Sequence, residues 1–158
     1  MRFTLPDQRE KLSSVALGGR NFLLVGSEED GSVMIFNSAT KKLLDRRYYF
    51  EKSNNNSLSV SCFLNKKIHR FHKVDHLIYF EPNNYAGVVG NTLIVDSIHQ
   101  RLGKSEFEIA EEENLEVTSL KLSKRWNRVV LTAWNGIVKI FDLENKYWID
   151  CSSICAEG

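Results

Sequence analysis

The residues best suited to metal chemistry lie in one short segment of the 158-residue sequence. His69, His72 and His76 occur within IHRFHKVDH, a spacing that on a helix would bring two imidazole rings together. The residues around them have strand periodicity, and the neighbouring lysines and arginine would repel a cation. A zinc site also needs further ligands at matching spacing, and the sequence offers none. We therefore expect structural or solvated histidines, and neither a metal nor another cofactor.

The same segment carries a basic run with an aromatic residue inside it. Phe71 lies among the cations Lys66, Lys67, Arg70 and Lys73. A basic stretch of this kind can contact RNA or phosphate, and it can equally be a solvated loop. Nucleic-acid binding through Lys66 to Lys73 is therefore an alternative function, and the solvated loop is the simpler interpretation.

Motifs for catalysis are missing from the sequence. It contains no Gly-x-Ser-x-Gly elbow, no glycine-rich phosphate loop, no His-Glu-x-x-His and no cysteine in a nucleophile context. The three cysteines are an odd number without framework spacing, which favours reduced thiols, although Cys151 and Cys155 could bridge in an oxidising compartment. We expect a protein that is not an enzyme.

Charge and hydropathy exclude several further classes. Lys and Arg number 21 against 20 for Asp and Glu, so no global field favours nucleic acid or an anionic membrane. No apolar run approaches the ~20 residues that span a bilayer, and residues 1–6 lack the apolar core of a signal peptide. The sequence predicts an intracellular protein of the cytoplasm or nucleus, without membrane association.

The strongest structural signal is the segment from Val117 to Leu143. VTSLKLS alternates apolar and polar residues, RVVLTAW is a compact apolar run, and the alternation returns from Ile137 onward. Asn135-Gly136, the dipeptide that most readily forms a tight hairpin turn, separates the second run from the third. This segment predicts an antiparallel meander.

Two earlier segments repeat the pattern. In the first, FLLVGS leads through Asp30-Gly31 to SVMIFN, and six positions separate Asp30 from Phe36, as they separate Asn135 from Phe141. The middle copy has LIYF, YAGVV, a Gly90-Asn91 turn and TLIVD, with Val95-Asp96 as its terminal pair. The spacing of the three copies is typical of propellers and repeat arrays.

This repeated pattern resembles the WD-repeat β-propeller family, with about three degenerate repeats. The pairs Phe36-Asn37, Val95-Asp96 and Phe141-Asp142 stand where the family has Trp-Asp, and no repeat has the family's Gly-His dipeptide. The resemblance implies an all-β fold, a β-propeller-like array of four-stranded antiparallel blades that is partial or incomplete. It also implies a non-catalytic protein-protein interaction scaffold that is a subunit or segment of a larger complex.

The array divides the chain into five parts. We expect an N-terminal lead (1–10), a first blade (11–50), an insertion or loop (51–73), a second blade (74–110) and a third blade (111–155). The insertion accounts for the longer step between the first two copies, and it is either an ordinary long loop or a partner-binding element.

Partner-binding residues are expected in the turns between second and third strands. In propellers that this chain resembles, these turns open on the face most used by partners. Glu28 and Glu29 occupy this turn in the first copy, and Trp134 holds the corresponding place in the third. An exposed Trp134 would be a plausible anchor, whereas packing between blades is at least as common for tryptophan.

Three blades do not close a ring, since propellers typically have 4 to 8. The outer faces of an open array would leave apolar surface uncovered. We therefore expect one of three arrangements: the chain is part of a longer protein, other protein subunits complete the propeller, or two copies of the chain form a homodimer that closes a six-bladed ring. The alternative is a small closed ring with a fourth blade hidden in Leu58 to Phe71.

Overall fold

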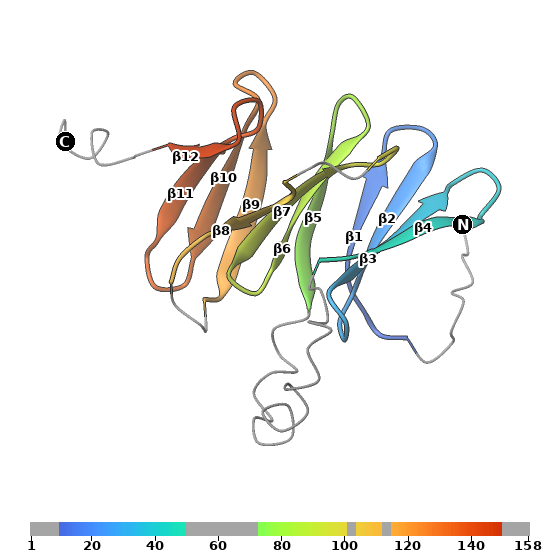
Figure 1. Cartoon of the computed structure of the whole chain (residues 1–158), viewed down its shortest axis with the longest axis horizontal. Coiled ribbons are helices and arrows are strands. Elements are labelled where there is room, and N and C mark those ends of the chain that lie inside the picture. Colours follow the sequence, from blue (N-terminus) through green and yellow to red (C-terminus); the bar gives the residue numbers. More distant parts are fainter. Residues whose placement is uncertain (1–9, 50–72, 101–103, 112–114, 150–158) are drawn as a thin grey trace.

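The computed structural model describes residues 10–49, 73–100, 104–111 and 115–149. These residues form twelve strands in three antiparallel four-stranded sheets, with no helix among them (Figure 1). We call the sheets blades 1, 2 and 3 in chain order. The strand bounds are β1 Leu12–Gly18, β2 Phe22–Ser27, β3 Ser32–Asn37, β4 Leu43–Tyr48, β5 Val74–Phe80, β6 Asn84–Val89, β7 Thr92–Ser97, β8 Glu106–Glu108, β9 Val117–Ser123, β10 Arg128–Ala133, β11 Val138–Asp142 and β12 Tyr147–Ile149.

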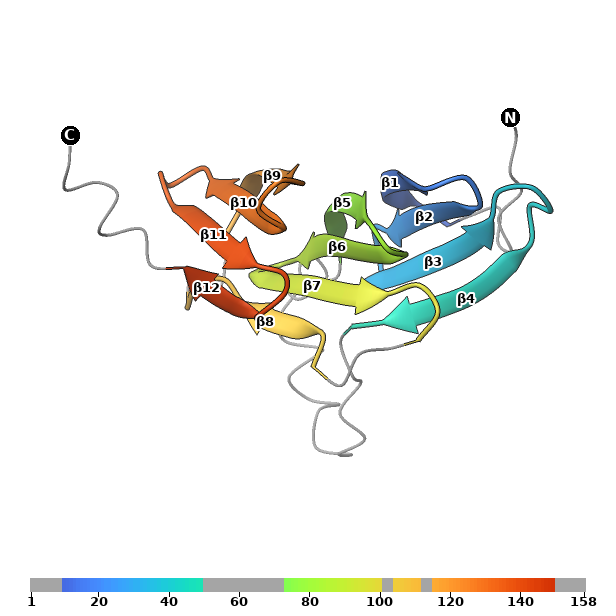
Figure 2. The same ribbon diagram turned by 90° about the horizontal axis from the view of Figure 1, so that it is seen from above.

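Each blade is a meander whose strands follow one another in sequence order from the inner to the outer edge. The inner strands β1, β5 and β9 lie side by side, and the outer strands β4, β8 and β12 lie on the opposite side of the array (Figure 2). The blades are thus arranged radially, as in part of a propeller, and the all-β prediction of stacked four-stranded blades is confirmed.

The turns that the sequence predicts are present. In blade 1 the Asp30 side chain accepts a hydrogen bond from the Ser32 backbone N–H at 3.0 Å, and Gly31 has a φ of 67°. In blade 3 Asn135 accepts a similar bond from the Ile137 N–H at 3.2 Å, and Gly136 has a φ of 85°. Glycine adopts these left-handed conformations without the steric penalty of a Cβ atom.

Two apolar cores lie between the blades. Between blades 1 and 2 the core contains Leu24, Val33, Ile35, Leu77 and Ile94. Between blades 2 and 3 it is larger, and its members are Phe80, Ala86, Val88, Leu93, Val95, Phe107, Ile109, Leu115, Val117, Leu120, Val129, Leu131, Ala133, Phe141 and Leu143. Because a strand alternates its side chains, blade 2 contributes one face to each core.

The strand register corrects the predicted alignment of the middle repeat. Phe36 pairs with Leu23 in blade 1, and Phe141 pairs with Val129 in blade 3. The equivalent pair in blade 2 joins Asp96 to Tyr85, because β7 has the same length as β3 and begins at the equivalent position. Asp96, and not Val95, therefore occupies the place of Phe36 and Phe141. The predicted alignment of Val95-Asp96 with the other two terminal pairs was wrong by one residue.

Several other expectations fall wholly or partly outside the described residues. These concern the greater part of the insertion at 51–73, the fourth blade within Leu58 to Phe71, and the cysteines Cys62, Cys151 and Cys155. The structure describes strands from Leu12 to Ile149, and three blades are present within that part of the chain.

Candidate interaction surfaces

The seam between blades 1 and 2 contains a buried polar network. Asp96 is fully buried, and its Oδ2 atom accepts a hydrogen bond from the Tyr49 hydroxyl at 2.9 Å. The Tyr49 hydroxyl also hydrogen-bonds that of Tyr85. Arg47 Nη1 lies 3.6 Å from Asp96 Oδ2, and Nη2 donates to the Ile98 carbonyl at 2.7 Å. Residues of β4 and the segment after it thus reach across to β7.

The network shifts the pKa of three of its groups. Burial, reinforced by Tyr85 and Asp96, raises the pKa of Tyr49 far above its ordinary value. Burial also raises the pKa of Tyr85 to about 12. For Arg47 burial acts in the opposite direction, but the hydrogen bond to Asp45 and the nearby Asp96 carboxylate outweigh it, so the pKa of Arg47 is raised. Both tyrosines are therefore neutral and Arg47 is charged at physiological pH.

The equivalent place in the seam between blades 2 and 3 is aromatic. Phe141 packs against Phe107 of the blade 2 outer strand, with ring centroids 4.7 Å apart, and against Trp148 at 4.9 Å. Trp148 Nε1 donates to the Glu108 carbonyl at 2.9 Å. Blades 2 and 3 thus each receive side chains from the outer-strand region of the blade before them. These side chains are polar in the first seam and aromatic in the second.

Blade 3 has a face on which no described element packs. Val138 and Ile140 in β11 occupy the positions of Val33 and Ile35 in blade 1, counting back from the strand ends. The two blade 1 residues are buried against blade 2, whereas Val138 is 55% exposed and Ile140 is half-buried. Blade 3 therefore presents apolar residues at positions that blades 1 and 2 use for blade-to-blade packing.

This uncovered face of blade 3 extends over all four strands. Alternation places Ser119 and Lys121 of β9 and Val130 and Thr132 of β10 on the same side as Val138 and Ile140. Tyr147 of β12 pairs with Asp142 and is 51% exposed. We call Val130, Thr132, Val138, Ile140 and Tyr147 the open face.

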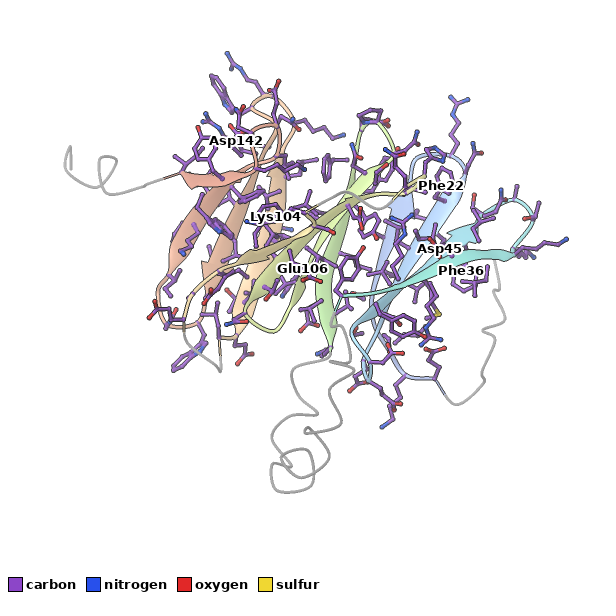
Figure 3. The ribbon with its side chains drawn as sticks, in the orientation of Figure 1. Phe22, Phe36, Asp45, Lys104, Glu106 and Asp142 are labelled. Atoms are coloured by element: carbon purple, nitrogen blue, oxygen red, sulfur yellow. The ribbon has the colours of Figure 1, made fainter. Side chains whose placement is uncertain are left out.

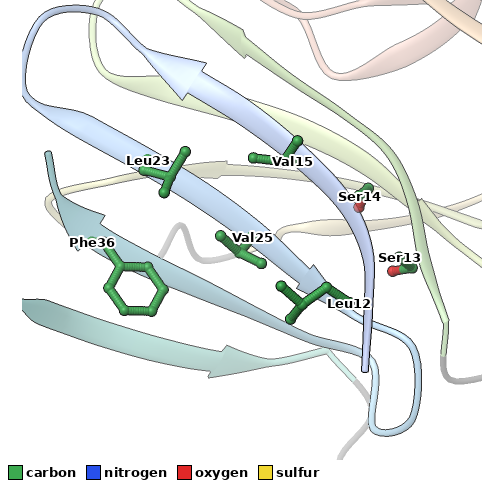
Figure 4. A pocket seen from close by; sticks show the side chains of 7 residues that line it. All are labelled: Leu12, Ser13, Ser14, Val15, Leu23, Val25 and Phe36. Atoms are coloured by element: carbon green, nitrogen blue, oxygen red, sulfur yellow. The ribbon is translucent and has the colours of Figure 1, made fainter. Parts of the chain in front are cut away.

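Blade 1 has a hollow on the side away from blade 2. It measures about 460 Å³, and its lining is largely apolar (Figure 4). Leu23, Val25, Met34 and Phe36 of β2 and β3 form a separate buried cluster on this side, and three of them line the hollow. Leu12 and Val15 of β1 line it too, and both are exposed. The remaining lining residues are Ser13 and Ser14.

The predicted partner-binding residues lie at one edge of the array. Glu28 and Glu29 are exposed in the β2–β3 turn, where Asp30 forms an ion pair with Arg46 at 2.6 Å. Partial burial favours a raised pKa for Asp30, but hydrogen bonds with Ser32 and Ser27 and the charge of Arg46 together outweigh it, so the pKa of Asp30 is lowered. Trp134 follows β10 and is 67% exposed, so it does not pack between blades. Because the β2–β3 and β10–β11 turns leave their blades in the same direction, these residues share an edge but lie two blades apart.

The predicted basic and histidine residues lie mostly beyond the described ranges. The residues outside these ranges are Lys66, Lys67, His69, Arg70 and His72. Lys73 is described, and its ammonium lies 3.3 Å from Asp75. His76 Nε2 hydrogen-bonds the Val117 carbonyl at 2.8 Å and so links β5 to the start of β9, which is a structural role.

The described residues contain neither a metal-binding cluster nor a membrane-spanning helix. Acidic, histidine and cysteine side chains form no group of three or more that could hold a metal ion there. Nor do those residues include a helix with the length and apolar character that a membrane crossing requires.

Sequence reasoning did not find the network of Arg47, Tyr49, Tyr85 and Asp96. The available signal was the absence of an aromatic residue from the middle repeat, since a polar residue at Asp96 requires buried hydrogen-bonding partners. Tyr49 lies 47 positions from Asp96 and in another blade. Arg47 also lies in that other blade, and no local pattern links these residues to Asp96.

Comparisons with known proteins identify the fold. No protein-family model matches the sequence, and no curated protein matches it significantly. Among solved structures, the Pan2 WD40 domain of Neurospora crassa superposes with a TM-score of 0.66 at 9% identity, over 92% of this chain and 39% of that one. A chain of a mitotic checkpoint complex crystal structure superposes with a TM-score of 0.62 at 13% identity, over 91% of this chain and 37% of that one.

The described chain therefore has the fold of a WD-repeat propeller, and it forms only part of one. It spans less than two fifths of the length of these two neighbours, and it contains three blades in its described part. The predicted likeness to WD-repeat propellers and the partial array are both confirmed at the level of the fold.

Proposed function

We propose that this chain is a non-catalytic protein-interaction scaffold, and that it acts as one segment of a larger WD-repeat propeller assembly inside the cell. The open face carries this proposal. In blades 1 and 2 the equivalent apolar positions are buried against the blade that follows. In blade 3 these positions are exposed or half-buried, so the open face is a surface on which another blade can pack. A stable interface conceals such apolar surface from water.

Two further observations support the proposal. The solved structures that this chain resembles are longer than it is, and one comes from a multiprotein complex. The described residues bring together no catalytic constellation: Arg47, Tyr49, Tyr85 and Asp96 bond to one another within a seam, and Asp142 accepts hydrogen bonds from the backbone of its own turn. The open face could be covered by a further segment of polypeptide, by another subunit or by a second copy of this chain.

The test is a charge placed in the middle of the open face. Val138→Asp would bury an unpaired carboxylate in the proposed interface, and we expect the apparent Kd of the assembly to rise at least about a hundredfold. Gln100→Asp is the control for the added charge, because Gln100 is exposed in the segment after β7 of blade 2, whose two faces are already covered by blades 1 and 3. The measurement is the mass of the assembly by size-exclusion chromatography with light scattering.

The outcomes separate the proposal from a general effect of charge. Dissociation by Val138→Asp alone supports blade packing on the open face. Equal behaviour of the two variants, whether both assemble or both dissociate, contradicts it.

A further inference from the structure

The turns of the array are divided by charge between its two edges. Because the strands are antiparallel, the β1–β2, β3–β4, β5–β6, β7–β8, β9–β10 and β11–β12 turns all lie at the upper edge in Figure 1. The described residues of these six turns include two carboxylates, Glu81 and Glu144, and seven cations. The cations are Arg20, Lys41, Lys42, Lys104, Lys124, Arg125 and Lys146. We call this the basic edge.

The opposite edge has the reverse composition. It comprises the β2–β3, β6–β7 and β10–β11 turns and the described segments that lead into each blade. Six carboxylates lie there against the two cations Lys11 and Lys73. The carboxylates are Glu10, Glu28, Glu29, Asp30, Glu111 and Glu116. The near-neutral balance of the whole chain therefore conceals a separation of charge across the fold.

The cations of the basic edge differ from those within the sheets. Arg46, Arg47 and Arg128 each lie within ion-pair distance of a carboxylate. In the described part of the chain, none of the seven cations of the basic edge has such a partner. Lys146 is attracted by the buried Asp96 carboxylate, whereas the attraction of the other six cations for an anion is not already satisfied within the described part of the fold.

Blade 3 gives the basic edge an anchor. In the β9–β10 turn the Arg125 guanidinium lies 5.1 Å from the ring centroid of Trp126, and Trp126 is 60% exposed. Lys124 is adjacent and exposed. Tryptophan and arginine are the residues that most often dominate binding energy at interfaces. The stacking also limits the freedom of the Arg125 side chain, which lowers the entropic cost of fixing it on a partner.

We propose that the basic edge is a docking surface for an acidic segment of a protein partner, with Lys124, Arg125 and Trp126 at its centre. The charge distribution favours such a segment over nucleic acid. A nucleic-acid-binding domain commonly has a strongly basic overall charge, whereas this chain has a net charge of +1 and an acidic opposite edge. A short acidic segment needs only the local field of one edge, and the acidic edge would repel it from the wrong side.

The test compares charge reversal at the two edges. The probes are a fluorescently labelled oligoglutamate peptide and a labelled single-stranded oligouridylate, both measured by fluorescence anisotropy at low and moderate salt. Lys124→Glu with Arg125→Glu reverses two charges on the basic edge. Lys11→Glu with Lys73→Glu makes the same change in net charge on the acidic edge, so it is the matched control.

We expect oligoglutamate to bind the wild-type chain with an affinity that falls as salt rises. Reversal at the basic edge should weaken this binding about tenfold, and reversal at the acidic edge should change it less than about twofold. Trp126→Ala should weaken it without changing the salt dependence, because it removes no charge.

Three results would overturn the proposal: no binding of oligoglutamate by the wild-type chain, equal weakening by the two reversals, or tighter binding of oligouridylate than of oligoglutamate. The last would identify the basic edge as a nucleic-acid surface. None of these results bears on the open face, because the turn residues changed here lie outside it.

Discussion

Asp96 determines the chemistry of the first seam. Most side chains around it are apolar and buried, and a carboxylate in such surroundings is stable only when it is paired and hydrogen-bonded. Arg47, Tyr49 and the Ser97 N–H supply these partners, the last at 2.9 Å from Asp96 Oδ1. The residue at the equivalent position of blade 1 is Phe36, which is labelled in Figure 3. Phenylalanine occupies the same position in the other two blades. In this seam, specific hydrogen bonds and an ion pair therefore take the place of aromatic packing.

Removal of Arg47 should therefore be costly. Arg47→Met leaves the buried Asp96 without its cation, and we expect a loss of about 3–5 kcal/mol in the free energy of unfolding. The control is Arg128→Met, because Arg128 lies 3.7 Å from Asp142 but has a side chain that is 41% exposed; its loss should stay below about 1 kcal/mol. Urea denaturation measures both. Equal losses would show that Arg47 does not compensate a buried charge.

Tyr85 should make the protein sensitive to alkali. Its pKa is raised to about 12 in the folded state, against about 10 for an ordinary tyrosine. A raised pKa means that the contribution of Tyr85 to stability is complete below about pH 10 and is lost as the pH rises toward about 12. We expect the urea midpoint to fall over this window, and to fall less in Tyr85→Phe. Parallel curves for the two proteins would contradict this assignment.

At the scale of the elements, close packing of β2 on β5 depends on Gly26. A Cβ atom at this position would lie 2.8 Å from the Val74 Cβ and would collide with the Ser14 hydroxyl. Ser14 already donates a hydrogen bond to the Val74 carbonyl at 2.6 Å, so neither neighbour can move freely. The glycine therefore sets the distance between blades 1 and 2 at this point.

Gly26→Ala should separate the two blades locally. We expect it to destabilise the protein by roughly 1–3 kcal/mol and to increase hydrogen exchange in β5. Gly136→Ala is the control, because its added Cβ meets nothing within 4 Å and its cost, about 1 kcal/mol, arises only from the φ of 85°. Unchanged exchange in β5 of Gly26→Ala would show that the seam adapts without separating.

The strands themselves were well predicted from sequence. Phe22–Ser27 and Val117–Ser123 have the predicted bounds. The first is a short apolar run that is buried on both faces of its sheet, and the second alternates apolar and polar residues, so both patterns are typical of strands. The register of the middle repeat was predicted wrongly by one residue, because Val95-Asp96 lacks the aromatic residue that marks this position in the other two copies. The register of a repeat can be predicted from sequence only where the same type of side chain recurs at the marker position.

The surfaces were less predictable than the strands. The exposure of Trp134 and the face that Val138 occupies depend on which blades are neighbours, and a sequence does not state this directly. The incomplete array itself did follow from sequence, since counting repeats requires only local patterns. The separation of charge between the two edges could not be predicted without the sheet topology, because the topology determines which turns lie at the same edge.

At the scale of the whole molecule, the three blades form a wedge of a propeller with two chain-terminal faces. In a closed ring each blade is covered on both sides, so a wedge lacks part of the burial that stabilises the complete fold. The hollow beside Leu12 and Val15 and the open face of blade 3 lie at the two ends of the wedge. Completion of the ring is therefore the central claim of this account.

The most direct test is the molar mass of the purified wild-type chain in solution. The account predicts a mass above 18.2 kDa by light scattering, from a second copy or a co-purifying subunit, or a chain that stays soluble only with such a partner. A homogeneous monomer of 18.2 kDa that unfolds cooperatively, with amides of β11 as protected from hydrogen exchange as those of β3, would contradict it.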